Sequence, residues 1–253
     1  MFYQYKDISL YYEKYGDKGK NIIIIPGWGN NRKTFYYIIN FLKKYHTVYI
    51  IDLPGFGNSS FSHNDLTIYD YTLLIKSFIE NKNIDNPILI GHSFGGRIII
   101  TLSGYYRIKI DKIILIDSAG IKPKKNIFRL FKLYLYKFLK SLKFFIPKKN
   151  KKNYLKKLIN IFGSNDYKNL NNNMRKTFIN IVNEDLKYYL KDIEAETLII
   201  WGKDDKDTLL KDGKKMNKLI KNSALIELTG DHFCYLYNKI LINRIIYAFL
   251  KDE

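Results

Sequence analysis

Ser93 lies in a pentapeptide that could make its hydroxyl group a nucleophile. The pentapeptide is Gly91-His-Ser-Phe-Gly95, with apolar runs before it at residues 88–90 and after it at residues 98–102. The pattern predicts a strand, a tight turn and a helix, in which the two glycines stand where a Cβ atom would strike the neighbouring strand or helix. The amides at the start of that helix would face an anion forming on a substrate. We therefore predict a nucleophile elbow at Ser93.

A serine hydroxyl is a poor nucleophile at neutral pH unless a nearby base takes its proton. Four histidines are available. His46 precedes a predicted strand, His63 lies in a polar loop, and His92 would project away from Ser93 across the turn. His232 follows the predicted strand 224–228, and sites in open α/β sheets lie beyond the carboxyl ends of strands. His232 is therefore the predicted base.

The base in turn needs a carboxylate that orients it. The loop after the predicted strand 197–201 offers three candidates, which are Asp204, Asp205 and Asp207. Asp117, at the end of the predicted strand 112–116, is an outside candidate. We expect the carboxylate in the loop after the strand that precedes the strand of His232. One of these aspartates is needed because the chain order Ser, Asp, His is the one that this architecture uses.

Acyl transfer also needs donors for the oxyanion of its tetrahedral intermediate. One should be the backbone N–H of Phe94, which follows the nucleophile. The second should come from Pro26-Gly-Trp-Gly-Asn30, the loop after the apolar run 22–25. Its glycines let the backbone pass close to a substrate, and Trp28 would offer its amide.

The elements that must position these residues alternate between short β-rich runs and longer helical stretches. This order is typical of a mostly parallel sheet with helices on both faces. Besides an antiparallel edge hairpin at 3–15, the predicted strands are residues 21–25, 47–51, 87–90, 112–116, 197–201 and 224–228. The predicted helices are residues 33–44, 67–81, 94–106, 209–221 and 238–251.

One long segment interrupts the alternation. We predict that residues 1–120 and 197–253 form the core and that residues 121–196 form an inserted helical cap. Between positions 118 and 165 the chain has 14 basic residues and no acidic residue. On a helical wheel through 127–146, one arc holds Arg129, Lys132, Lys137, Lys140 and Lys143, and the opposite side holds Phe131, Leu135, Phe138, Leu142 and Phe145. This surface is either a solvated lysine face or a docking surface for an acidic acyl carrier protein or an anionic lipid surface.

Composition limits the function classes. The net charge is +19, but only six of the 43 basic residues are Arg, which argues against nucleic-acid binding because such sites favour bidentate Arg contacts. The single cysteine allows no intramolecular disulfide and suits a reducing compartment. The first residues lack an apolar signal-peptide core, and no apolar run approaches the roughly 20 residues of a membrane span. These features predict a cytoplasmic protein without a transmembrane segment.

The motifs together resemble those of the α/β-hydrolase fold superfamily. They are Pro26-Gly-Trp-Gly29, Asp52-Leu-Pro-Gly-Phe-Gly57, Gly91-His-Ser-Phe-Gly-Gly96, Gly202-Lys-Asp-Asp205 and Gly230-Asp-His232. Pro26 stands where many relatives carry His. The first two motifs are similar to those of the pimeloyl-acyl-carrier-protein methyl ester esterases of biotin synthesis, and they are shared with many other esterases.

The resemblance implies how the residues act together. The acid is commonly the third residue after the glycine that ends its strand, which corresponds to Asp205. The implied function is a serine hydrolase of carboxylic esters that needs no cofactor or metal, with Ser93, His232 and Asp205 as the triad and the amides of Trp28 and Phe94 as the oxyanion hole. A thioesterase, a carbon–carbon bond hydrolase, an aminopeptidase and a ligand-binding receptor without turnover remain alternatives on this fold.

Overall fold

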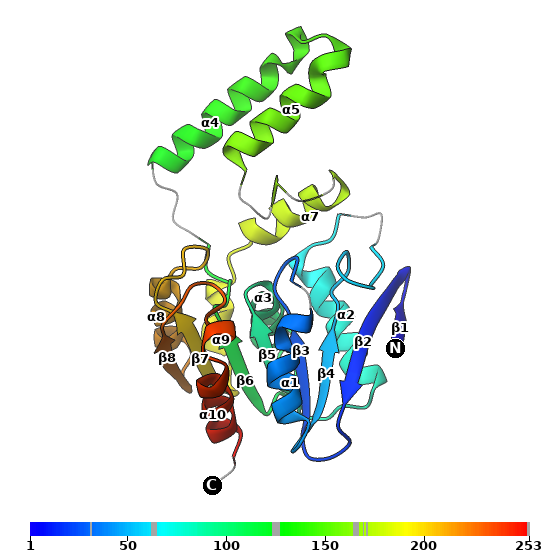
Figure 1. The fold of residues 1–253 in the computed structure, drawn as a ribbon, viewed down its shortest axis with the longest axis vertical. Coiled ribbons are helices and arrows are strands. Elements are labelled where there is room, and N and C mark those ends of the chain that lie inside the picture. Colours follow the sequence, from blue (N-terminus) through cyan, green and yellow to red (C-terminus); the bar gives the residue numbers. More distant parts are fainter. Residues whose placement is uncertain are drawn as a thin grey trace.

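The computed structural model describes residues 1–30, 32–61, 65–122, 127–163, 167–168, 170 and 172–251. Within these residues an eight-stranded sheet runs in the order β1-β2-β4-β3-β5-β6-β7-β8 (Figure 1). Its strands are β1 Phe2–Tyr5, β2 Ile8–Tyr15, β3 Asn21–Ile25, β4 Thr47–Ile51, β5 Ile88–His92, β6 Lys112–Ile116, β7 Glu196–Gly202 and β8 Ser223–Leu228. Strand β2 pairs antiparallel with β1 and β4, and the other neighbours are parallel. The predicted mostly parallel sheet with an edge hairpin is confirmed.

Helices cover both faces of this sheet. The helical segments of the core are η1 Arg32–Phe35, α1 Tyr36–Leu42, α2 Ile68–Asn81, α3 Phe94–Ile100, the π-helical turn η2 Thr101–Tyr105, α8 Leu210–Leu219, α9 Cys234–Tyr237 and α10 Lys239–Leu250. Helices α1 and α10 pack in one apolar cluster, and α2, α3 and α8 pack in the other. The sheet is therefore shielded from water on both sides.

The burial of both faces explains why the central strands are apolar at every position. In β3, Ile22 and Ile24 contribute to the cluster under α1 and α10, whereas Ile23 and Ile25 contribute to the opposite cluster. Alternate side chains of a strand point to opposite faces, so a strand covered on both sides reads as a continuous hydrophobic run.

The chain between β6 and β7 leaves the sheet and forms further helices. They are α4 Ile127–Ser141, η3 Leu142–Phe145, α5 Lys148–Phe162, α7 Asn172–Asn183 and η4 Lys187–Asp192. Helices α4 and α5 stand away from the sheet as a pair, and α7 lies between this pair and the body of the fold (Figure 1). Leu186, Leu190 and Ile193, near η4, are buried in the core cluster. We call residues 127–162 the hairpin.

The described helices include none with the length and apolar character of a membrane-spanning segment. The hairpin is the part of the fold that extends farthest from the sheet in Figure 1.

Candidate active site

Ser93 occupies a strained turn between β5 and α3. Its backbone angles are φ 49° and ψ −109°, in the region that non-glycine residues rarely adopt. Hydrogen bonds hold the turn in place: the Ser93 N–H donates to the Ile116 carbonyl at 3.1 Å, and the Ser93 carbonyl accepts from the N–H groups of Gly96 at 3.1 Å and Ala119 at 3.0 Å. The end of β6 therefore supports the turn that presents the Ser93 hydroxyl.

The two glycines of the pentapeptide lie where the backbone is crowded. A Cβ atom on Gly91 would lie 2.6 Å from Ile99 Cδ1 and 2.8 Å from the Gly95 carbonyl carbon. A Cβ atom on Gly95 would overlap the carbonyl oxygen of Ile25, at the end of β3. The close approach of α3 to β3 and β5 therefore requires glycine at both positions.

Asp205 is buried in the loop after β7, with 4% of its surface exposed. Oδ1 accepts the backbone N–H groups of Asp207 at 2.8 Å and Thr208 at 3.0 Å. Oδ2 accepts the Thr208 hydroxyl at 2.7 Å and lies 2.8 Å from His232 Nδ1. Burial by itself would raise the pKa of Asp205, but the hydrogen bonds and charge of His232 and the bonds from Thr208 outweigh it and lower the pKa. The side chain is therefore a carboxylate at neutral pH.

His232 lies in the loop between β8 and α9. Its Nδ1 faces Asp205, which leaves Nε2 as the nitrogen that can exchange a proton with a hydroxyl group. Burial lowers the pKa of His232, but the hydrogen bond and negative charge of Asp205 outweigh burial, and the net pKa is raised above its ordinary value. The structure thus joins the predicted base to one of the three competing loop aspartates.

The other two loop aspartates, Asp204 and Asp207, are exposed. One side-chain atom each of Asp205, Asp207 and His232 lies within 4.8 Å of the others, which is close enough to consider a cation. Asp205, however, already uses both oxygens to accept protein N–H and O–H donors. The geometry therefore fits an acid and base pair better than a set of metal ligands.

The Asp117 carboxylate makes its hydrogen bonds to groups other than His232. Its Oδ1 accepts the Gly202 N–H at 2.7 Å, its Oδ2 accepts the Cys234 S–H at 3.1 Å, and its backbone has a φ of 43°. Burial raises the pKa of Asp117 to about 7. Asp117 therefore connects the end of β7 to the start of α9, next to the loops that carry Asp205 and His232.

The raised pKa of Asp117 gives a prediction for stability. An acid whose pKa is higher in the folded than in the unfolded chain binds its proton more tightly in the folded state, so folding weakens as pH rises through the interval between about 4 and 7. Because one pKa unit corresponds to about 1.4 kcal/mol, we expect Asp117→Asn to be more stable than wild type at alkaline pH by up to about 4 kcal/mol. Urea unfolding at acid and at alkaline pH measures this difference. An equal loss of stability with pH in both proteins would contradict the assignment.

His92 is buried and uncharged, and it supports the loops of the site through hydrogen bonds. Burial lowers its pKa to about 3. Its Nε2 lies 2.8 Å from the His232 carbonyl oxygen, which can only accept, and its Nδ1 lies 3.0 Å from Asn30 Nδ2. His92 therefore links the loop after β3 to the loop that carries His232. His46 lies in the bend directly before β4, as the sequence predicts, and His63 lies outside the described residues.

The loop after β3 lies against the elbow. A Cβ atom on Gly27 would lie 2.7 Å from His92 Nδ1 and 3.1 Å from Ser93 Cβ. Within the described part of the chain, the backbone N–H groups of Trp28 and Phe94 donate no hydrogen bond. Both predicted oxyanion donors thus belong to segments that meet at Ser93.

An aromatic cluster lies beside these two donors. The Trp28 ring packs edge to face against Phe56 at 4.9 Å, Phe94 at 5.3 Å and Phe178 at 5.2 Å between ring centroids. Phe178 belongs to α7, so this helix of the insertion covers the loop beside Ser93. The Trp28 Nε1 atom is buried without a hydrogen-bond partner among the described residues. The surface next to Ser93 is therefore apolar and aromatic.

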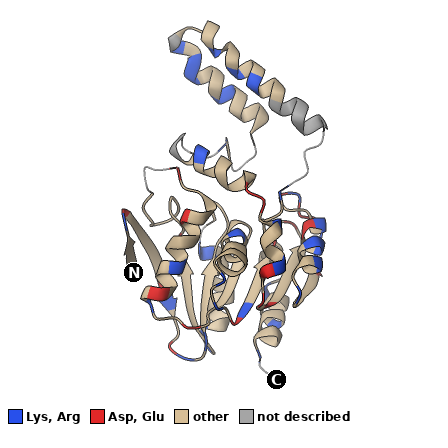
Figure 2. Cartoon of the chain, turned by 180° about the vertical axis from the view of Figure 1, so that it is seen from behind, with Lys and Arg blue, Asp and Glu red and all other residues tan. Residues whose placement is uncertain are grey.

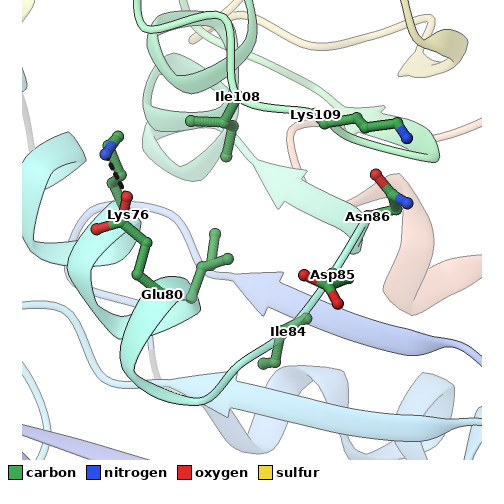
Figure 3. Close-up of a pocket in the computed structure, with 8 residues that line it drawn as sticks. Lys76, Glu80, Ile84, Asp85, Asn86, Ile108 and Lys109 are labelled. Carbon is green, nitrogen blue, oxygen red and sulfur yellow. Dashed lines mark hydrogen bonds and ion pairs between the residues drawn. The ribbon is translucent and has the colours of Figure 1, made fainter.

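The structure also has a hollow of about 390 Å³ that shares no lining residue with this cluster (Figure 3). It is lined by Lys76, Ile79, Glu80, Ile84, Asp85, Asn86, Ile108 and Lys109. These residues come from the end of α2 and from the segments just before β5 and β6, so the hollow lies at the amino ends of parallel strands, opposite the edge that carries Ser93. Sites in open α/β sheets lie at the carboxyl ends, and we assign this hollow no part in the chemistry.

Known proteins share both the sequence and the fold. Residues 20–158 match the family described as alpha/beta hydrolase fold. The chain is 30% identical to a pimeloyl-[acyl-carrier protein] methyl ester esterase of Wigglesworthia glossinidia brevipalpis, over 93% of this chain and 95% of that protein. It is 28% identical to the AB hydrolase superfamily protein YisY of Bacillus subtilis, over 96% and 95% of the two chains. The enol-lactonase of Burkholderia xenovorans LB400 has the same fold, with a TM-score of 0.77, 16% identity and complete coverage of both chains.

Proposed function

We propose that this chain, which belongs to the α/β hydrolase fold family, hydrolyses carboxylic esters through an acyl-enzyme formed on Ser93. It is a hydrolase that acts on ester bonds, the activity for which its relatives are named. The observation that carries the mechanism is the 2.8 Å contact between His232 Nδ1 and Asp205 Oδ2, in loops at the edge of the sheet that bears the Ser93 turn.

In the first half of the reaction, the Ser93 hydroxyl attacks the ester carbonyl while His232 Nε2 takes its proton. The negative charge on the tetrahedral oxygen is stabilised by the N–H groups of Trp28 and Phe94. The Asp205 carboxylate stabilises the imidazolium and keeps Nδ1 protonated. The imidazolium then protonates the departing alkoxide, and an acyl ester of Ser93 remains.

Water completes the reaction. His232 takes a proton from the water as the water attacks the acyl-enzyme. The second tetrahedral intermediate then collapses to the carboxylic acid while the His232 imidazolium returns that proton to the Ser93 oxygen. Besides the ester and water, each step of the proposed mechanism uses protein groups.

The role of residues 121–196 as a cap remains a proposal, and the contacts of α7 support it. Met174 of α7 packs against the loop at Gly55, where a Cβ atom would lie 2.6 Å from the methionine sulfur, and the Thr177 hydroxyl accepts the Leu66 N–H at 3.1 Å. Together with Phe178 on Trp28, these contacts place α7 over the carboxyl edge of the sheet. We propose that residues 121–196 select the substrate by shaping this aromatic surface.

The aromatic surface favours an acyl chain as the group bound next to Ser93. Methyl esters of carboxylic acids of increasing chain length are the first substrates to test, and an ester carried by an acyl carrier protein, such as the substrate for which the Wigglesworthia relative is named, extends that series. Turnover with release of acid supports the esterase. Tight ligand binding without multiple turnover would instead favour a receptor on the same fold.

The raised pKa of His232 predicts how kcat/KM should depend on pH. The base must be neutral to accept a proton from Ser93, so kcat/KM should rise with pH through the pKa of His232, with a midpoint above the ordinary value of 6.5. Asp205→Asn removes the charge that raises this pKa and should lower the midpoint, whereas Asp204→Asn should leave it unchanged. Because Asp117 titrates in the same region, the profile of Asp117→Asn is the control that separates the two groups. A midpoint that moves with Asp117→Asn and not with Asp205→Asn would contradict the assignment.

A further inference from the structure

The tip of the hairpin exposes two adjacent phenylalanines. Phe144 and Phe145, in the turn η3 between α4 and α5, are 83% and 86% exposed, which makes them the most exposed large apolar side chains of the described residues. Phe138 on α4 is also exposed. Aromatic rings are normally buried, and a contiguous apolar patch left in water usually marks a surface that meets a partner.

Lysines surround this aromatic tip. The exposed or half-buried lysines of the hairpin nearest to it are Lys140, Lys143, Lys149, Lys151 and Lys152. Lys151 Nζ lies 5.9 Å from the centre of the Phe144 ring. The drawn hairpin is blue at several places and red at none, in agreement with the sequence, which has no acidic residue from 118 to 165 (Figure 2). The tip therefore combines exposed apolar rings with lysine charges, and it has no acidic residue.

The shape of the hairpin suits a flat partner. Figures 1 and 2 both show α4 and α5 extending away from the body of the fold, so the tip can touch a broad surface without hindrance from the sheet. Contacts between the two helices support the pair: the Tyr154 hydroxyl donates to the Leu139 carbonyl at 2.6 Å, and the rings of Tyr136 and Phe162 pack at 5.8 Å between centroids. The hairpin is thus braced from within, while Phe138, Phe144 and Phe145 remain in solvent.

We propose that the tip of the hairpin docks the protein on anionic phospholipid bilayers, with Phe144 and Phe145 entering the interfacial region and the surrounding lysines contacting lipid phosphates. Lysine and aromatic side chains together favour this interface, because the rings leave water while the ammonium groups remain near the anionic headgroups. An acidic protein would satisfy the lysines but would need a matching apolar groove for the two neighbouring rings, whereas the interfacial region of a bilayer accepts them without one. The inference does not depend on the proposed esterase, because none of these residues belongs to the triad.

Co-sedimentation of the full chain with vesicles tests the proposal. The probes are phosphatidylcholine vesicles and phosphatidylcholine vesicles that contain about one third phosphatidylglycerol. We expect the anionic vesicles to bind at least about tenfold more protein than the neutral ones, and high salt to weaken the binding. The double variant Phe144→Ser/Phe145→Ser should lose about tenfold in binding to the anionic vesicles. The matched control Phe2→Ser/Tyr237→Ser removes two exposed aromatic rings outside the hairpin and should bind like wild type.

Charge reversal tests the electrostatic half of the proposal. Lys149→Glu/Lys152→Glu should abolish the preference for phosphatidylglycerol, whereas Lys218→Glu/Lys221→Glu, on exposed positions of the core, should keep it. Far-UV circular dichroism melts establish that each variant is folded, independently of enzyme activity. Equal binding to both vesicle types, or full binding by the Phe144→Ser/Phe145→Ser variant, would overturn the proposal. So would an acidic acyl carrier protein that binds the hairpin lysines while anionic vesicles do not.

Discussion

Replacing Ser93 with Ala is expected to abolish covalent labelling by a fluorophosphonate and to lower ester turnover by about 10⁴-fold or more, because the members of a triad act as a unit. Ala keeps the Cβ atom of Ser, so the strained backbone of the turn, with its φ of 49°, is the same in both proteins. The loss should therefore be one of chemistry, with an unchanged unfolding transition. Labelling followed by mass spectrometry and steady-state turnover of a short ester measure the two effects.

Ser118→Ala is the matched control for Ser93→Ala. Ser118 is buried, lies just beyond β6 and contacts α3 near Gly96, and its hydroxyl donates to the Ala119 carbonyl at 2.9 Å. We expect this variant to be labelled and to turn over ester like wild type within a few-fold. Near wild-type hydrolysis by Ser93→Ala would rule out Ser93 as the nucleophile and with it the proposed function.

The sheet could be predicted from the sequence because its central strands are covered on both faces. Residues 21–25, 47–51 and 112–116 coincide with β3, β4 and β6, and the other predicted strands differ from the structure by one or two residues at their ends. Continuous apolar runs with β-branched residues between polar loops are a strong signal for such strands. The four-residue helix α9 was not predicted, because a segment that short shows no periodicity.

The polar framework beneath the site was harder to predict. The sequence pointed to Ser93 and His232 and, through the family resemblance, to Asp205, but not to the hydrogen bonds of His92 or to the two donors that Thr208 gives Asp205. These contacts join loops that follow different strands, and only the order of the strands in the sheet brings them together. The only feature of the sequence that pointed to a role for His92 was its position directly before the nucleophile.

The same argument applies to the motif at Asp52. In the sequence this motif served only as part of the family resemblance, and the structure shows what its residues do. The Asp52 carboxylate accepts hydrogen bonds from the Arg32 guanidinium and from the Asn58 N–H. A Cβ atom on Gly57 would overlap the Asp52 carboxylate. The motif thus shapes the loop in which Phe56 lies, and Phe56 packs against Trp28. The pair Arg32 and Asp52 depends on a contact between segments that the sequence alone does not place.

The insertion was predicted as a unit by its length and composition, but not in its arrangement. The amphipathic wheel through 127–146 led to a basic face, and the described part of that face includes Lys137, Lys140 and Lys143. The side chains of Arg129, Phe131 and Lys132 lie outside the described residues. Periodicity cannot show that α4 and α5 leave the sheet while α7 remains on it, because that depends on which apolar faces find a partner. A cytoplasmic location and the role of 121–196 as a cap stay predictions.

Of the four aspartates near the site, Asp205 is the one whose replacement by Asn should lower kcat the most. We expect kcat to fall by about four orders of magnitude at neutral pH, because an amide in place of the carboxylate can favour the wrong tautomer of His232 and cannot stabilise the imidazolium. KM should change little, since Asp205 is buried and its carboxylate bonds to His232 and Thr208. Steady-state kinetics with one ester, and labelling rates with a fluorophosphonate, measure the effect on both halves of the reaction.

The three other aspartates serve as controls of increasing stringency. Asp204→Asn and Asp207→Asn alter exposed side chains of the same loop and should change kcat by no more than a few-fold, because neither carboxylate bonds to His232 in the structure. Asp117→Asn is the sharper comparison, because Asp117 is fully buried and holds Gly202 and Cys234 in place. An Asn at this position can still accept the Gly202 N–H, so we expect altered stability with kcat within about tenfold of wild type. If Asp117→Asn were instead as damaging as Asp205→Asn, and its kcat loss persisted at a pH where both proteins are fully folded, the orienting acid would belong to β6 and the assignment to Asp205 would be wrong.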